Sequence, residues 1–112
     1  MTAAQALALT LACEVPLILW LTARLPHLSR TRVALVAATA SCVTHPLAWR
    51  SALALTPDMY RTGLWLIEAI VVVIEALWYL LWLRPGWRRA ATWSLAANAS
   101  SATLGMLAWK LI

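Results

Sequence analysis

Charged residues are scarce in this sequence: they make up 12% of the 112 residues, whereas hydrophobic residues make up 63%. A soluble domain of this size carries about twice that share of charge, and the mean hydropathy here is +0.78. The composition therefore excludes a separate soluble domain and predicts an integral membrane protein, surrounded by a lipid bilayer. The net charge of +5 comes from basic residues between apolar runs, where they set membrane topology. No nucleic-acid partner is expected.

Sequence motifs of established sites are also missing. The chain has no EF-hand loop, no HExxH sequence and no Glu-x-x-His pair of the kind found in di-iron bundles. The two cysteines, Cys13 and Cys42, lie inside apolar runs, which favours small core side chains over a disulfide or a metal pair. The first apolar run has no basic residue before it and no clear cleavage site after it, so we expect a helix and not a signal peptide.

Four apolar runs predict an all-α fold, a four-helix transmembrane bundle in which residues 1–112 form one domain. At about 20 residues per crossing, the expected helices are residues 3–22, 33–55, 63–83 and 90–111. Small residues recur at helical spacing in the fourth of these helices, which predicts close packing against a neighbour. They are Ser94, Ala97, Ser101 and Gly105.

The basic residues predict the orientation of the bundle. Six of them, Arg24, Arg30, Arg32, Arg84, Arg88 and Arg89, lie in the turns after the first and third helices, and three, Arg50, Arg61 and Lys110, lie at the other end. Because cytoplasmic loops carry the excess of basic residues, we expect both of these turns in the cytoplasm and both termini on the non-cytoplasmic side. The expected location is a bacterial inner membrane.

Three of the four acidic residues fall inside predicted crossings, namely Glu14, Glu68 and Glu75. A carboxylate in hydrocarbon costs several kcal/mol unless it is protonated, paired or facing a wet cavity. Glu68 and Glu75 are seven residues apart, which places them on nearly one face of a helix, about 10 Å from each other. No lysine or arginine is clearly available inside the membrane to balance these acids.

Each predicted helix brings a polar residue to a common depth. At about 1.5 Å per residue, Glu14, His45 and Asn98 fall within a few Å of the membrane centre. Glu75 lies slightly toward the cytoplasm and Glu68 lies nearer the outside. We interpret these five residues as a cation- or proton-binding site.

A divalent transition metal is one candidate occupant. Glu14, His45 and Glu75 form a donor set that such metals accept, and Cys42 or Asn98 could add a further ligand. A relay of protons or cations without a fixed metal is a second interpretation. The third is a purely structural polar core, in which protonated glutamates are hydrogen-bonded to His45, Asn98 and Ser101.

The length, the four predicted helices and the sequence Ala-Cys-Glu-Val around Glu14 resemble the small multidrug resistance transporters. This resemblance implies that Glu14 exchanges protons for a cationic substrate. It covers the overall size and about four residues. The chain departs from the family by lacking a glycine-rich kink in the third helix, by two additional acids there, and by the pair His45-Pro46.

Three functions are compatible with this pattern. The first is a transport-like protein that binds or relays a cation. The second is an accessory subunit of a larger membrane complex, whose buried acids pair with basic residues of a partner chain. The third is an intramembrane enzyme acting on a lipid or quinone. Four helices seldom enclose a complete pathway, so a homo- or hetero-oligomer is expected.

Overall fold

The computed structural model consists of four long helices. In chain order they are α1 (Ala3–Leu21), α2 (Arg30–Leu53), α3 (Tyr60–Leu83) and α4 (Trp87–Leu111), and a short 3₁₀ helix, η1 (Pro57–Met59), precedes α3. The structure describes the backbone of residues 1–111 and the side chains of residues 1–108, and residues 1–111 contain no strand. The prediction of an all-α protein with four helices is confirmed.

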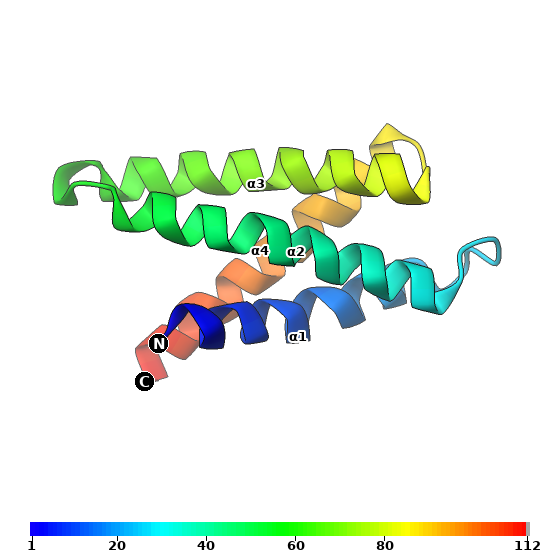
Figure 1. Cartoon of the computed structure of the whole chain (residues 1–112), viewed down its shortest axis with the longest axis horizontal. Helices are drawn as coiled ribbons and strands as arrows, with labels where there is room; N and C mark the ends of the chain where they lie inside the picture. Colours follow the sequence, from blue (N-terminus) through cyan, green and yellow to red (C-terminus); the bar gives the residue numbers. More distant parts are fainter. Residues whose placement is uncertain (112) are drawn as a thin grey trace.

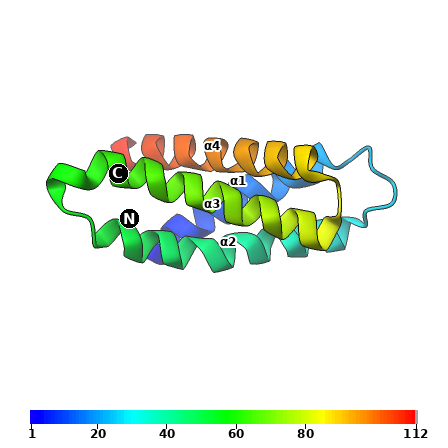
Figure 2. The same cartoon turned by 90° about the horizontal axis from the view of Figure 1, so that it is seen from above.

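The helices form a ring in which α1 and α3 each pack against both α2 and α4. The α1–α2 and α3–α4 connections lie at one end of the bundle, which we call the arginine end (Figures 1 and 2). The start of α1, the α2–α3 connection and the end of α4 lie at the opposite end, which we call the open end (Figure 2). In Figure 1, α4 crosses behind the other helices, from beside the end of α3 to beside the start of α1.

Three helices begin earlier than the apolar runs suggested. They start at Arg30, Tyr60 and Trp87, whereas residues 33, 63 and 90 were predicted. For α2 the reason is a helix cap, because the Ser29 hydroxyl accepts a hydrogen bond of 3.1 Å from the backbone N–H of Arg32. Apolar side chains stop where the chain leaves the apolar surroundings. The backbone hydrogen bonds of a helix can extend about one turn further, into the polar residues that flank the apolar run.

Two arginines of the arginine end bind helix termini. Arg30 donates from Nη1 to the carbonyl of Leu19 at 2.6 Å and from Nη2 to that of Thr22 at 2.9 Å, and Arg32 donates to the carbonyl of Trp82 at 2.6 Å. Three carbonyls at the ends of α1 and α3, where a helix leaves such groups without backbone partners, thereby accept hydrogen bonds. The side chain of Lys110, which the sequence predicts at the opposite end of the bundle, lies outside the described residues.

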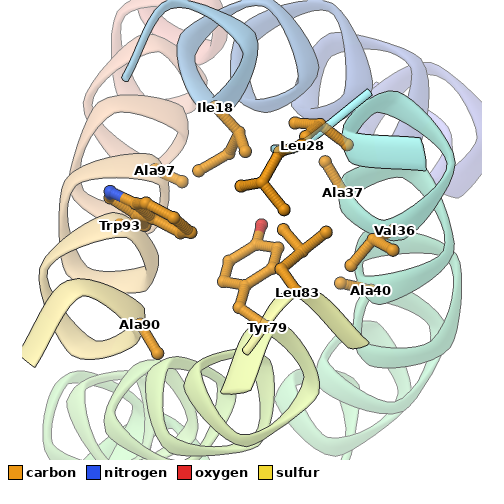
Figure 3. Close-up of a cluster of buried hydrophobic side chains, with 11 residues drawn as sticks. Ile18, Leu28, Val36, Ala37, Ala40, Tyr79, Leu83, Ala90, Trp93 and Ala97 are labelled. Carbon is orange, nitrogen blue, oxygen red and sulfur yellow. The ribbon is translucent and has the colours of Figure 1, made fainter. Parts of the chain in front are cut away.

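An apolar core fills the half of the bundle nearer the arginine end (Figure 3). Tyr79, Ile18 and Ala97 are fully buried there, and Leu83 and Trp93 are nearly so. Small residues on α2, including Ala37 and Ala40, let the helices approach closely. We call this the packed half.

Two segments of the chain are long and apolar enough to cross a membrane, Ala3–Leu21 and Pro57–Leu83. Within the described residues, α2 and α4 do not reach the same hydropathy. Both are rich in alanine, serine and threonine, and both carry two arginines in the first turn. Two helical segments are therefore candidates for crossing a membrane, by length and composition alone.

Candidate functional site

A layer of buried polar side chains borders the packed half. Glu14 of α1 and Glu75 of α3 are each 1% exposed, although both carry a carboxyl group. The helix α2 contributes Ser41 and Thr44, and α4 contributes Asn98, all of them buried. We call these five residues the carboxyl layer.

Glu14 is held by a single hydrogen bond. The Ser41 hydroxyl donates to its Oε2 atom at 2.8 Å. The other carboxyl oxygen, Oε1, is buried without a partner. One half of this carboxyl group therefore lacks the hydrogen bond that buried oxygens normally have.

Glu75 is held on both oxygens. The Asn98 amide donates to Oε1 at 2.7 Å, and the Thr44 hydroxyl lies 2.7 Å from Oε2. Thr44 Oγ1 also lies 3.0 Å from the carbonyl of Ala40, yet a hydroxyl has only one proton to donate. Both Thr44 contacts are satisfied together when Glu75 is protonated and donates to Thr44, which then donates to Ala40.

The two carboxyl groups are brought together by one face of α2. Ser41 and Thr44 are three residues apart, so their Cβ atoms lie about 5–6 Å from each other on that face. Because each hydroxyl contacts a different carboxyl, Glu14 and Glu75 are neighbours at the centre of the bundle. All the described hydrogen-bond partners of the two groups are neutral, so no base among residues 1–108 is hydrogen-bonded to either carboxyl group.

In the carboxyl layer, α4 is hydrogen-bonded to α3 through Asn98 and through the neighbouring Ser94. Asn98 donates from the same amide nitrogen to the carbonyl of Ser94 at 2.9 Å, which fixes the orientation of the amide toward Glu75. The Ser94 hydroxyl donates to the carbonyl of Val72 at 2.6 Å. The Ser94–Val72 hydrogen bond fixes α4 against α3 one turn before Asn98, and this helps to hold the Asn98 amide beside Glu75.

A cavity of about 270 Å³ occupies the other half of the bundle, which we call the hollow half. Its lining runs from Met1 and Tyr60, at the open end, to Glu14, Glu75 and Asn98 of the carboxyl layer. One water molecule occupies about 30 Å³ of the liquid, so the cavity has room for several waters beside these groups. It is large enough, and polar enough at its inner end, to receive a hydrated cation.

His45 and Glu68 line the cavity beyond the carboxyl layer. The ring of His45 stacks on Trp49 with centroids 6.0 Å apart. Glu68 lies on the face of α3 that also carries Glu75, as their spacing predicted. All five residues of the predicted site therefore line one cavity, two of them along its wall and three at its inner end.

Cys42 does not join the other predicted metal ligands. It is exposed on α2 and is absent from the cavity lining, and both cysteines are free thiols, with Cys13 half-buried. The prediction that Cys42 is a small core side chain is wrong, because the face of α2 that turns inward carries Ser41 and Thr44. No group of three or more histidine, cysteine or acidic side chains among the described residues is arranged to hold a metal ion.

Gly105 differs from the predicted small-residue packing on α4. Ser94 and Ala97 are buried against neighbouring helices. A Cβ atom added at Gly105 would meet nothing within 4 Å, and this glycine lines the cavity. The prediction of close packing is therefore wrong at Gly105, where the small residue leaves space open.

Ser41 and Thr44 were missed as partners of the acids. The buried residues of α2 recur at intervals of three and four, which is the period of one helix face. They are Val33, Val36, Ala37, Ala40, Ser41 and Thr44. Extending that face along the sequence would have identified both hydroxyls and would have excluded Cys42.

Comparison with protein-family models, with curated proteins and with solved structures finds no significant match to this chain. The carboxyl layer and the cavity beside it are therefore the features of this chain that indicate a function.

Proposed function

We propose that this chain is a membrane protein that binds a cation at the carboxyl layer and relays it, with the proton as the simplest case. The observation that carries the proposal is a pair of buried, neighbouring carboxyl groups with neutral partners at the inner end of a cavity. Such a pair favours the uptake of a proton or cation, because one positive charge offsets part of the free-energy cost of burying the two acids.

The four helices form a transmembrane bundle in this proposal. The outer surfaces of α2 and α4 support the assignment, because large apolar side chains are exposed there as well as on α3. On the described parts of α2 and α4 they are Leu35, Val43, Leu47, Leu53, Trp87, Leu95, Leu104, Met106 and Leu107. Such exposure is rare on soluble monomers. With the arginine end in the cytoplasm, as the basic residues predict, the cavity opens to the non-cytoplasmic side.

A proton or hydrated cation is favoured over a bound transition metal. The donors nearest the paired acids are hydroxyl and amide groups, and His45 stacks on Trp49 at the cavity wall. These donors suit the binding and release of protons better than the tight coordination of a metal. A resident metal remains an alternative that elemental analysis of the purified protein would reveal.

The accessory-subunit hypothesis is less well supported. The acids point into the chain's own bundle, so a basic side chain of a partner would have to enter the cavity to pair with them. The hypothesis of a lipid- or quinone-modifying enzyme has no reaction-specific group to support it. Both predict that the purified chain alone moves no cation.

The test is proton uptake by vesicles that contain the purified chain, driven by an imposed membrane potential and followed with an internal pH dye. We expect E75Q to reduce uptake to the level of protein-free vesicles. D58N is the matched control, since Asp58 is an exposed acid outside the cavity, and it should conduct as the unaltered chain does. Equal uptake by E75Q and D58N would reject the proposal.

A further inference from the structure

Two buried side-chain atoms among the described residues lack any hydrogen-bond partner. They are Oε1 of Glu14 and the hydroxyl oxygen of Tyr79. One is an acceptor whose neighbouring oxygen already has a partner, and the other belongs to a group that can donate. Leaving a buried polar group without a partner is costly, and these two groups have complementary chemistry.

Tyr79 lies between the packed half and the carboxyl layer. It follows Glu75 by four residues on α3, and Ile18 follows Glu14 by four residues on α1, so both pairs lie one turn apart on their helices. Figure 3 shows the ring of Tyr79 reaching from α3 into the centre of the bundle, with its hydroxyl directed toward the side where Leu28 and Ile18 lie. Side chains on a helix lean toward its N-terminus, so the ring leans from the packed half toward the level of Glu75.

The surroundings of Tyr79 offer few other partners. Within the apolar cluster that contains Tyr79, the other polar side-chain atom is the ring nitrogen of Trp93, which points away from the centre in Figure 3. The buried hydroxyls of Thr22 and Ser94 donate to backbone carbonyls, and that of Ser41 donates to Glu14. The hydroxyl is fully buried. A polar group kept in this position, where phenylalanine would fill the same volume, points to a partner that is not engaged in the present arrangement.

We propose that the Tyr79 hydroxyl donates a hydrogen bond to Oε1 of Glu14 whenever that carboxyl is ionised. Ser41 then serves Oε2 and Tyr79 serves Oε1, so both oxygens of the carboxylate have a donor. When Glu14 takes up a proton, its oxygen becomes a weaker acceptor, and Tyr79 returns to the arrangement described above. Tyr79 is thus a positioning residue for the proposed relay, and this role rests on the proposed function.

The charges around Glu14 come from two helices. From α3 the cavity receives Glu68 and Glu75, and from α2 it receives His45, while the amino group of Met1 stands at the open end. The described part of α4 presents only neutral groups to the cavity. A neutral donor such as Tyr79 stabilises an ionised Glu14 without adding a base that would hold the charge permanently.

A spectroscopic experiment tests the bond directly. The chain has two tyrosines, so Y60F leaves Tyr79 as the only one. With ring-labelled tyrosine, the infrared C–O stretch of Tyr79 should change between acidic and alkaline samples, and the change should vanish in Y60F/E14Q. Identical pH-dependent changes in Y60F and Y60F/E14Q, or no change in either chain, would overturn the inference.

Transport by Y79F gives a second and independent measurement. Hydrogen bonds to charged groups account for roughly tenfold effects or more, so Y79F should slow proton uptake at least tenfold while its thermal stability is unchanged or raised. D58N, whose side chain is exposed and lies outside the cavity, should conduct as the unaltered chain does. If E75Q abolishes uptake but Y79F conducts fully, this inference fails and the proposed function stands. If the unaltered chain moves no protons but the Tyr79 band depends on Glu14, the proposed function fails and the hydrogen bond is supported.

Discussion

The two halves of the bundle are built from the same four helices but differ in how the facing side chains meet. In the packed half, Ile18, Tyr79 and Trp93 close the space between the helices. In the hollow half, small residues such as Ala48, Ala102 and Gly105 leave a cavity of about 270 Å³. The carboxyl layer lies where the two halves join. We infer that one half supplies stability and that the other provides access to the acids.

The largest expected contrast concerns truncation of an apolar side chain in each half. Ile18→Ala should cost about 2–5 kcal/mol, because it opens a void in a fully buried site. Leu9→Ala should cost less than about 1 kcal/mol, since Leu9 already borders the cavity. The measurement is the free energy of unfolding in detergent micelles. Similar costs for the two variants would show that the halves do not differ in this way.

Enlarging a side chain on α4 gives a second contrast. Ala97→Leu should destabilise the fold by about 1–3 kcal/mol, because Ala97 is fully buried and the added atoms overpack the core. Gly105→Leu should leave the unfolding free energy nearly unchanged, since nothing lies within 4 Å of the added Cβ atom. The same variant should reduce proton uptake by filling the cavity. Unimpaired uptake by a folded G105L chain would show that the cavity is not the route.

The hydroxyl groups of α2 sharpen the contrast between the two acids. Ser41→Ala removes the only described partner of Glu14 and should cost about 1–3 kcal/mol. Thr44→Val should cost less, because the Asn98 amide still donates to Glu75. Thr39→Val is the control, since its exposed hydroxyl contacts its own helix and Trp78. The reverse ranking of S41A and T44V in unfolding measurements would contradict the proposed roles of these donors.

The smallest expected effect is that of Cys42→Ser. Because Cys42 is exposed on α2 and does not line the cavity, the substitution should change stability by no more than about 0.5 kcal/mol. Uptake and metal content should also remain unchanged. Loss of a stoichiometric metal from C42S, measured by elemental analysis, would instead support the predicted metal set that includes this thiol.

The sequence by itself determined the number of helices and the face that α3 turns inward. Long apolar runs favour helices, because a helix satisfies its backbone groups within one segment. A spacing of seven residues keeps Glu68 and Glu75 on one face of such a helix whatever surrounds them. Because charged residues are scarce in the sequence, the three acids inside apolar runs could be identified as candidate site residues. These features are local, so they can be derived without knowing which helices are neighbours.

Only the tertiary structure decided which residues of the other helices meet the acids. Cys42, Thr44 and His45 lie within one turn of α2, and a small rotation of that helix exchanges the residue that faces Glu75. The packing of Ala37 and Ala40 against the neighbouring helices sets the rotation, and it places Thr44 on Glu75 and Cys42 outside. The division into packed and hollow halves also depends on how the helices are arranged. Small residues such as Ala40 and Ala97 allow close packing where the helices converge, whereas Gly105 leaves a cavity where they do not.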